Sequence, residues 1–170
     1  MRIHITGNAG SGKSTLAEKI GTILGLDVFS LDAVVWKEGW KVTPQDERRR
    51  LEKMIVARPQ WIIEGVSSIA REAADTIIFL DFPRNVCYLR CAKRNVHYLF
   101  KSRPGLPDNC PEIKIVPTLF KIIWNFSSTV KPKIVKDLES FGKVGVRLKC
   151  NEDVVRYIKE IECSKNTHRS

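Results

Sequence analysis

The feature that most constrains this chain is a glycine-rich loop placed directly after a short apolar strand. The pattern GxxxxGK[ST] is met at residues 7–14, which read GNAGSGKS. Residues 2–6 are rich in β-branched side chains and predict a strand, and Leu16 and Ile20 then recur at the spacing of an amphipathic helix that stops near Gly25. A strand, a glycine loop and a helix in this order predict a parallel α/β sheet.

The loop itself predicts a binding site for nucleotide phosphates. Glycines permit positive φ and let backbone N–H groups point toward an anion, and the following helix adds the positive end of its dipole. We expect Lys13 to reach the β- and γ-phosphates of ATP and the Ser14 hydroxyl to bind Mg²⁺. The expected ATP-binding residues of the loop are Gly7, Asn8, Ala9, Gly10, Ser11, Gly12, Lys13, Ser14 and Thr15.

Four further apolar segments, 27–31, 61–63, 76–80 and 144–149, predict the rest of the sheet. Helical patterns separate most of them, and no linker or internal repeat divides the chain. We therefore expect one domain over residues 1–170 with a three-layer P-loop NTPase fold, in which a five-stranded parallel sheet carries helices on both faces.

Two of the expected helices have particular features. One begins near Thr43, which is expected to cap it, and runs to about Ala57. The other is a long helix from Pro83. Its expected buried stripe consists of Val86, Leu89, Val96 and Leu99.

Carboxylates follow several of the predicted strands, at the edge where ligands bind in an open parallel sheet. Glu64 precedes Gly65 and can hold Mg²⁺ opposite Ser14. Asp32 can orient or deprotonate a hydroxyl group that accepts a phosphoryl group. The alternative for Glu64 is a helix-capping or surface residue, and the alternative for Asp32 is a turn residue that follows a strand. Asp81 is expected to cap the long helix and is left out of the site.

The net charge of +10 is concentrated in about one third of the chain. Residues 84–136 hold eleven Lys and Arg against two acidic residues, which implies a polyanionic partner, either nucleotide phosphates or nucleic acid. A solvated basic surface is the alternative. Arg90 and Arg94 share a helix face and can stack on a base or bind phosphate oxygens. The loop after them carries Lys101 and Arg103 and can close as a lid.

Several classes of protein are disfavoured. The five cysteines form no CxxC pair and are odd in number, which indicates reduced thiols and a cytoplasmic location. No apolar run reaches the roughly 18 residues of a membrane span, and the start of the chain leaves no room for a signal peptide. A guanine-binding NKxD motif is missing, and the chain is too short for a helicase or an AAA-type lid domain. A compact P-loop kinase or a degenerate relative of one remains.

The combination resembles the adenylate kinase-like group of P-loop kinases. GNAGSGKST at 7–15 matches its first motif, residues 62–65 (IIEG) look like its third-strand acid-glycine motif, and Arg90 and Arg94 fall where that family carries arginines for ATP. The resemblance implies the strand order 2-3-1-4-5, an acceptor-site insertion at about 33–58 and a lid at about 101–117.

Over almost the whole chain, the sequence most closely resembles the bacterial DNA topology modulation (FlaR-related) proteins, a name that records a proposed effect on DNA. The matching segments are Leu31-Asp32, Trp36, Gly39-Trp40, 61–65, 110–112 and 131–134. The acceptor-site arginine of adenylate kinases has no clear equivalent after the second strand, where Trp36 and Trp40 stand instead. A single lid cysteine, Cys110, excludes a four-cysteine zinc site.

The sequence thus predicts an enzyme that moves the γ-phosphoryl group of Mg·ATP to a small acceptor, either a nucleoside monophosphate or another hydroxyl metabolite. Lys13, Arg90, Arg94 and Asp32 are the expected catalytic residues, Arg90 also binds ATP, and Ser14 and Glu64 hold Mg²⁺. An ATP-dependent DNA-binding protein is the alternative. A membrane partner is not expected, and the chain is expected to be a monomer or a dimer.

Overall fold

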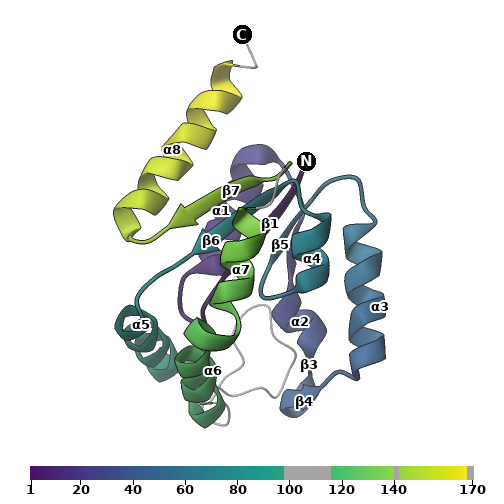
Figure 1. Ribbon diagram of the computed structural model, residues 1–170, viewed down its shortest axis with the longest axis vertical. Coiled ribbons are helices and arrows are strands. Elements are labelled where there is room, and N and C mark those ends of the chain that lie inside the picture. The colour runs from purple at the N-terminus through teal and green to yellow at the C-terminus, as the bar shows by residue number, and fades with distance from the viewer. Residues whose placement is uncertain (98–115, 140–141, 168–170) are drawn as a thin grey trace.

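A five-stranded parallel sheet runs through the computed structural model (Figure 1), which describes residues 1–97, 116–139 and 142–167. The spatial order is β2-β5-β1-β6-β7, and each neighbouring pair is parallel. Counted along the chain this is the order 2-3-1-4-5, so the predicted fold is confirmed. The strands are β1 (Arg2–Gly7), β2 (Val28–Ser30), β5 (Trp61–Glu64), β6 (Thr76–Leu80) and β7 (Val144–Leu148).

Eight helices surround this sheet in the described part of the chain, and none of them is long and apolar enough to cross a membrane. They are α1 (Lys13–Leu24), α2 (Leu31–Val35), α3 (Gln45–Val56), α4 (Ser68–Ala73), α5 (Arg84–His97), α6 (Val116–Thr129), α7 (Lys131–Leu138) and α8 (Asn151–Thr167). The expected lid at about 101–117, with Lys101, Arg103 and Cys110, lies outside the described residues except for its last two.

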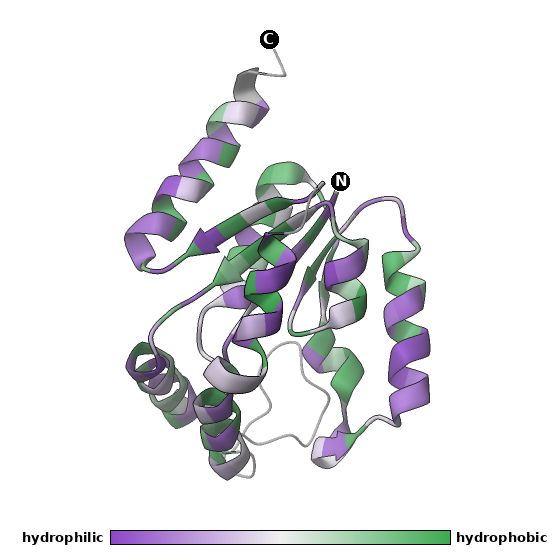
Figure 2. Ribbon diagram, viewed as in Figure 1, coloured by the Kyte–Doolittle hydropathy of each residue, from purple (hydrophilic) through white to green (hydrophobic). Residues whose placement is uncertain are grey.

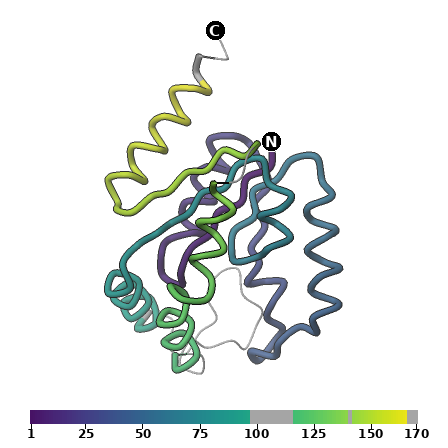
Figure 3. Tube along the Cα trace, in the orientation of Figure 1, coloured from purple at the N-terminus to yellow at the C-terminus, as the bar shows by residue number. Residues whose placement is uncertain are grey.

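A small antiparallel hairpin lies between α2 and α3. It consists of β3 (Trp36–Lys37) and β4 (Lys41–Val42), joined by the 3₁₀ turn η1 (Glu38–Trp40). In Figure 3 the chain leaves the sheet after β2, passes through this hairpin and returns along α3 before it re-enters as β5. The hairpin, α2 and α4 were not predicted, because elements this short carry too few residues to show a hydrophobic period.

Side chains on successive residues of the strands point to opposite faces, and helices cover both faces. Ile5 and Ile78 belong to a core with α1, α5 and α8, whereas Trp61 and Ile77 belong to a second core with residues of α3, α4 and α7. Figure 2 shows apolar residues on the strands and polar residues along the outer side of α3. The near-continuous apolar strands of the sequence follow from this burial on both faces.

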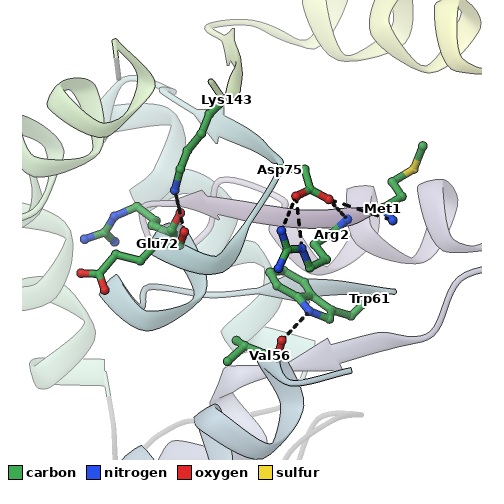
Figure 4. A network of polar contacts seen from close by, with 8 residues as sticks. Met1, Arg2, Val56, Trp61, Glu72, Asp75 and Lys143 are labelled. Carbon is green, nitrogen blue, oxygen red and sulfur yellow. Dashed lines mark hydrogen bonds and ion pairs between the residues drawn. The ribbon is translucent and has the colours of Figure 1, made fainter. Parts of the chain in front are cut away.

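The amino-terminal ends of the strands are closed by polar contacts (Figure 4). The Arg2 backbone N–H and its guanidinium donate to Asp75 just before β6, with Nη2 2.6 Å from Oδ1. Lys143 Nζ donates to the carbonyl oxygen of Glu72 at 2.9 Å. Trp61 Nε1 donates to the carbonyl oxygen of Val56 at the end of α3. The opposite, carboxyl edge of the sheet is left for the site.

The buried stripe predicted for α5 is wrong at Leu89 and Val96, whereas Val86 is partly buried against the core and Leu99 lies outside the described residues. Leu89 and Val96 are each 72% exposed, while Cys87, Cys91 and Asn95 are buried. Small side chains are required there because the glycine loop packs directly on this helix: a Cβ atom at Gly10 would lie 2.5 Å from the Cys87 carbonyl oxygen.

The predicted cap of α3 is also wrong. The helix begins at Gln45 with Pro44 as its N-cap. Thr43 is buried, and its backbone N–H donates to the carbonyl oxygen of Val35 at 2.9 Å. Thr43 therefore ties the end of the hairpin to α2.

Candidate active site

A cavity of about 570 Å³ opens at the carboxyl edge of the sheet, between the glycine loop, α2, the hairpin, α5 and α6. Most of the residues predicted from the sequence line it. They are Gly7, Ala9, Gly10, Gly12, Lys13, Ser14, Thr15, Asp32, Glu64, Arg90 and Arg94. The two other predicted residues, Asn8 and Ser11, are buried within the loop.

Asn8 fixes the shape of the loop from behind. Its side-chain Nδ2 donates to the carbonyl oxygen of Ile123 in α6 at 3.1 Å, and its Oδ1 accepts from the backbone N–H of Ala9 at 2.8 Å. Lys13 Nζ donates to the carbonyl oxygen of Asn8 at 3.0 Å, so the lysine side chain lies folded over the loop. The loop is thereby attached to α6 as well as to α5.

At the end of β5, the Glu64 carboxylate accepts hydrogen bonds from two hydroxyl groups. Its Oε1 accepts from Ser14 Oγ at 3.2 Å and from Ser30 Oγ at 2.5 Å, and its side chain is buried. Carboxylate and hydroxyl oxygens are the ligands that Mg²⁺ prefers, so the predicted pair of Ser14 and Glu64 fits this ion. Ser30 was missed, although its place just before Asp32 at the end of β2 is a usable signal.

His4 supports the backbone that follows Glu64. It is fully buried in β1, and its Nε2 lies 3.2 Å from the carbonyl oxygen of Gly65. Burial, and then the positive charge of Arg71, lower the pKa of His4 to about 3. The ring is therefore neutral at pH 7, and because a carbonyl oxygen only accepts, Nε2 carries the proton and donates it.

Gly65 makes a close contact that a side chain would prevent. Its φ is +134°, and a Cβ atom would lie 2.7 Å from Cβ of Leu31 at the start of α2. The glycine therefore lets the acidic end of β5 and the first turn of α2 lie together. Asp32, the second residue of α2, reaches the same cavity as Glu64 because of this contact.

Arg90 lies between the main cavity and a smaller one of about 280 Å³. Its Nη1 donates to the carbonyl oxygen of Ser11 at 3.0 Å and its Nη2 to Oδ1 of Asn151 at 2.6 Å. The guanidinium carbon is 4.3 Å from the centre of the Phe82 ring. Arg94, one turn later on α5, lines the main cavity.

Asp81 does not cap α5, because both its oxygens are used elsewhere. Lys131 Nζ is 2.8 Å from Oδ1, and Arg147 donates from Nε to Oδ2 at 2.9 Å. Burial alone would raise the pKa of Asp81, but the hydrogen bonds from Lys131 and Arg147 outweigh it and lower the pKa. Lys131, one of the cations of the basic segment, is thus directed to this ion pair.

The cavity is also lined by residues outside the predicted set of site residues. Arg48 on α3 lines it, so an arginine from the stretch after β2 reaches the cavity. Arg48 was missed because it follows the second strand by 18 positions, and only the return of α3 along the cavity brings it there. The further lining residues are Ser30, Leu31, Val35, Trp36, Trp40, Gly65, Val66, Leu119, Ile122 and Phe126.

This chain is similar to known proteins in its fold. No protein-family model and no curated protein matches the sequence. Solved structures do match, 193 chains in all, and three kinases are among them. A shikimate kinase from Acinetobacter baumannii in complex with shikimate is 15% identical, with 94% of this chain and 89% of that chain covered and a TM-score of 0.58.

The second structure is a gluconokinase from Sinorhizobium meliloti, 19% identical, with 98% and 91% of the two chains covered and a TM-score of 0.52. The third is an unliganded sugar kinase from a Janibacter species, 16% identical, with 98% and 92% covered and a TM-score of 0.51. The chain therefore shares its fold with these three kinases.

Proposed function

We propose that this protein is an ATP-dependent phosphotransferase that moves the γ-phosphoryl group of Mg·ATP to a small acceptor, a nucleoside monophosphate or another hydroxyl metabolite. One observation carries the proposal. A single cavity is lined by the donor residues Lys13, Ser14 and Glu64 and, on its other side, by Asp32 and the insertion at about 33–58. A protein that only binds or hydrolyses ATP has no need of a second, structured wall.

On the donor side, the proposed chemistry rests on position and charge. Lys13 exchanges the Asn8 carbonyl oxygen for phosphate oxygens and stabilises the charge of the transferred group. Ser14 and Glu64 would hold Mg²⁺, which would neutralise phosphate charge. Arg94 adds a cation at the rim of the cavity. The planar guanidinium of Arg90, beside the smaller cavity, suits contact with the base of ATP.

On the acceptor side, Asp32 orients the attacking hydroxyl group. As the new O–P bond forms and the bond to the ADP oxygen breaks, the hydroxyl proton passes to the Asp32 carboxylate. Gly65 and His4 hold the backbone that keeps Asp32 and Glu64 in one cavity. No covalent enzyme intermediate is needed.

The test is the substitution Lys13→Ala, with Lys53→Ala as a matched control. Lys53 is exposed on the outer side of α3 and does not line the cavity. Loss of a charge-assisted contact at Lys13 is expected to weaken ATP binding by about 1.5–3 kcal/mol, and to lower the rate of phosphoryl transfer further. Calorimetry measures the first, and ADP release across a panel of nucleoside monophosphates and hydroxylated metabolites measures the second. Unchanged turnover in Lys13→Ala would contradict the mechanism.

A second candidate, the DNA-binding function implied by the topology modulation proteins, is supported by one surface. Trp124 on α6 is 63% exposed, Arg84 lies over its ring with the guanidinium carbon 5.0 Å from the centre, and Lys121 is exposed nearby in the helix. Exposed aromatic rings among cations suit stacking on bases. Phe126, in contrast, is buried in the core. This candidate requires DNA affinity that falls steeply with salt and persists without phosphoryl transfer to any acceptor.

A further inference from the structure

We infer that Trp36, Trp40 and Arg48 form the acceptor subsite, and that its ligand is a compact hydroxy acid with a ring. The ring lies against the two indoles, and a carboxylate or phosphate group binds the Arg48 guanidinium. This inference rests on the proposed function, because it assigns a chemical class to the acceptor of the same cavity.

The two tryptophans form a fixed aromatic wall. Trp36 comes from β3 and Trp40 from η1, their ring centres are 5.2 Å apart, and the ring planes meet at 83°. Both residues line the cavity and both are partly buried. An edge-to-face pair is a favoured aromatic geometry, so the wall keeps its shape before any ligand arrives.

The backbone of this wall is strained. Trp40 has φ +61°, and among the described residues it is the one non-glycine residue with positive φ. A bulky residue rarely adopts this conformation, and such strain gathers at ligand sites. Gly39 before it, with φ +73°, and the pairing of Trp36 with Val42 hold the turn in place. The chain thus keeps an unfavourable turn that directs a large flat ring into the cavity.

Arg48 is held from behind by a buried carboxylate. Its Nε donates to Oε1 of Glu52 at 2.9 Å, and Glu52 is only 5% exposed. The other oxygen, Oε2, accepts from Ser67 Oγ at 2.5 Å, and Ser67 caps α4 by accepting from the Ala70 N–H. Glu52 is therefore a positioning residue, which fixes Arg48 to the start of α4.

The other edge of the guanidinium remains available to a ligand. Within the described ranges, Nη1 and Nη2 of Arg48 make no hydrogen bond to the protein, while the residue lines the cavity. Two parallel N–H groups match a carboxylate or a phosphate group. Asp32, which lines the same cavity, repels an anion, so the acidic group binds at Arg48 and the hydroxyl group faces Asp32.

Apolar side chains of the same cavity favour an acceptor with a ring over an open-chain one. Leu31, Val35 and Val66 line the cavity beside the indoles and offer no hydrogen-bonding group. An open-chain polyol would leave this surface and the indole faces poorly covered. A neutral ring would leave the Arg48 N–H groups without an acceptor, which costs affinity.

The test compares three pairs of probes that differ in charge: shikimate with its methyl ester, AMP with adenosine, and gluconate with glucose. Binding is followed by quenching of indole fluorescence in a Trp124→Phe background, because Trp124 lies exposed on α6 and does not line the cavity. We expect shikimate or AMP to bind at least ten-fold more tightly than its neutral partner and than gluconate. The two ring acids distinguish a carboxylate from a phosphate ligand.

Arg48→Met with Glu52→Gln removes both charges together, so that no unpaired carboxylate is left buried. This double variant is expected to abolish the preference for the acid. Arg49→Met is the matched control, since Arg49 is the exposed next residue of α3 and does not line the cavity. Glu52→Gln alone is expected to raise the acceptor KM several-fold and leave kcat unchanged, as befits a positioning residue.

The inference is overturned if ring acids bind no better than their neutral partners, or equally well in the double variant, while ATP binding responds to Lys13→Ala. Failure of the proposed function looks different. In that case the ring acids still bind through Arg48, but no phosphoryl group reaches them from Mg·ATP.

Discussion

Gly10 lies against the backbone of α5, where a Cβ atom would meet the Cys87 carbonyl oxygen at 2.5 Å and Cys91 Sγ at 2.8 Å. The same contact explains why cysteines, with their small side chains, form the buried stripe of this helix. Burial, and then the neighbouring Cys91, raise the pKa of the Cys87 thiol to about 11, so the thiol stays protonated and acts as an apolar packing group.

Gly10→Ala therefore tests close packing under the phosphate loop. Gly25→Ala is its matched control, because Gly25 has a similar φ of +69° against +75°, but a Cβ atom added there would have no neighbour within 4 Å. We expect Gly25→Ala to lower the free energy of unfolding by about 1 kcal/mol through backbone strain alone. Gly10→Ala should cost about 1–3 kcal/mol more through overpacking, and should also weaken ATP binding. Urea unfolding and calorimetry measure these effects, and equal costs at the two glycines would contradict the contact.

At the scale of elements, α5 and α6 form one unit that supports the phosphate loop. Tyr88 and Phe120 stack with ring centres 4.7 Å apart, and the Tyr88 hydroxyl donates to the Phe120 carbonyl oxygen at 3.1 Å. Asn8 attaches the loop to the next turn of α6. The inner face of α6 contributes Ile123 and Phe126 to the core, so displacement of this helix is expected to disturb the loop.

Two adjacent isoleucines on α6 allow a matched test of this packing. Ile123 is 1% exposed and Ile122 is 42% exposed. We expect Ile123→Ala to lower the free energy of unfolding by about 2–5 kcal/mol, because it leaves a cavity in the core, and Ile122→Ala by roughly 0.5 kcal/mol. Urea denaturation followed by circular dichroism gives both values. A similar cost at both positions would mean that α6 presents a different face to the sheet.

At the scale of the whole molecule, a polar group is enclosed in an apolar sheet. His4 lies in the central strand β1. The positive charge of the buried Arg71 on α4 lowers the pKa of His4. Arg71 Nε is itself paired with Oδ2 of Asp137 on α7 at 2.7 Å. Because His4 also contacts the Gly65 carbonyl oxygen, the residue that supports the site backbone makes the stability of the fold depend on pH.

The folded pKa of His4, about 3, lies below the ordinary value of 6.5. Between these two values the unfolded chain binds the proton and the folded chain does not, so lowering the pH through this window destabilises the protein. From pH 7 to pH 5 the loss attributable to His4 is expected to be about 2 kcal/mol.

His4→Gln, which retains a donor for the Gly65 carbonyl oxygen, should remove that part of the loss. Urea unfolding of both proteins at pH 7 and pH 5 measures it, in a range where ordinary carboxylates are still ionised. For each protein the loss is taken relative to its own free energy of unfolding at pH 7, so a change in stability caused by the substitution itself does not enter. Identical pH dependence of the two proteins would show that His4 is not buried as a neutral ring.

The sequence by itself determined the sheet, the glycine loop and most of the predicted residues that line the cavity beside it. These signals are local: GxxxxGK[ST] after an apolar strand requires one backbone shape, and apolar runs buried on both faces predict a parallel sheet. Glu64 and Asp32 could be predicted for the same reason, since each follows a strand whose end must lie at the ligand edge. Arg90 and Arg94 were found through their spacing of one helical turn.

Only the tertiary structure decided which further residues line the cavity and which face of α5 is buried. Arg48 reaches the cavity because α3 returns alongside it, and Trp40 does so through an unfavourable turn that no propensity favours. Cys87 and Cys91 replace the predicted apolar stripe because the loop packs on α5 too closely for larger side chains. These positions depend on contacts between segments far apart in the chain. The hydrophobic pattern of one segment does not specify which other segment packs against it.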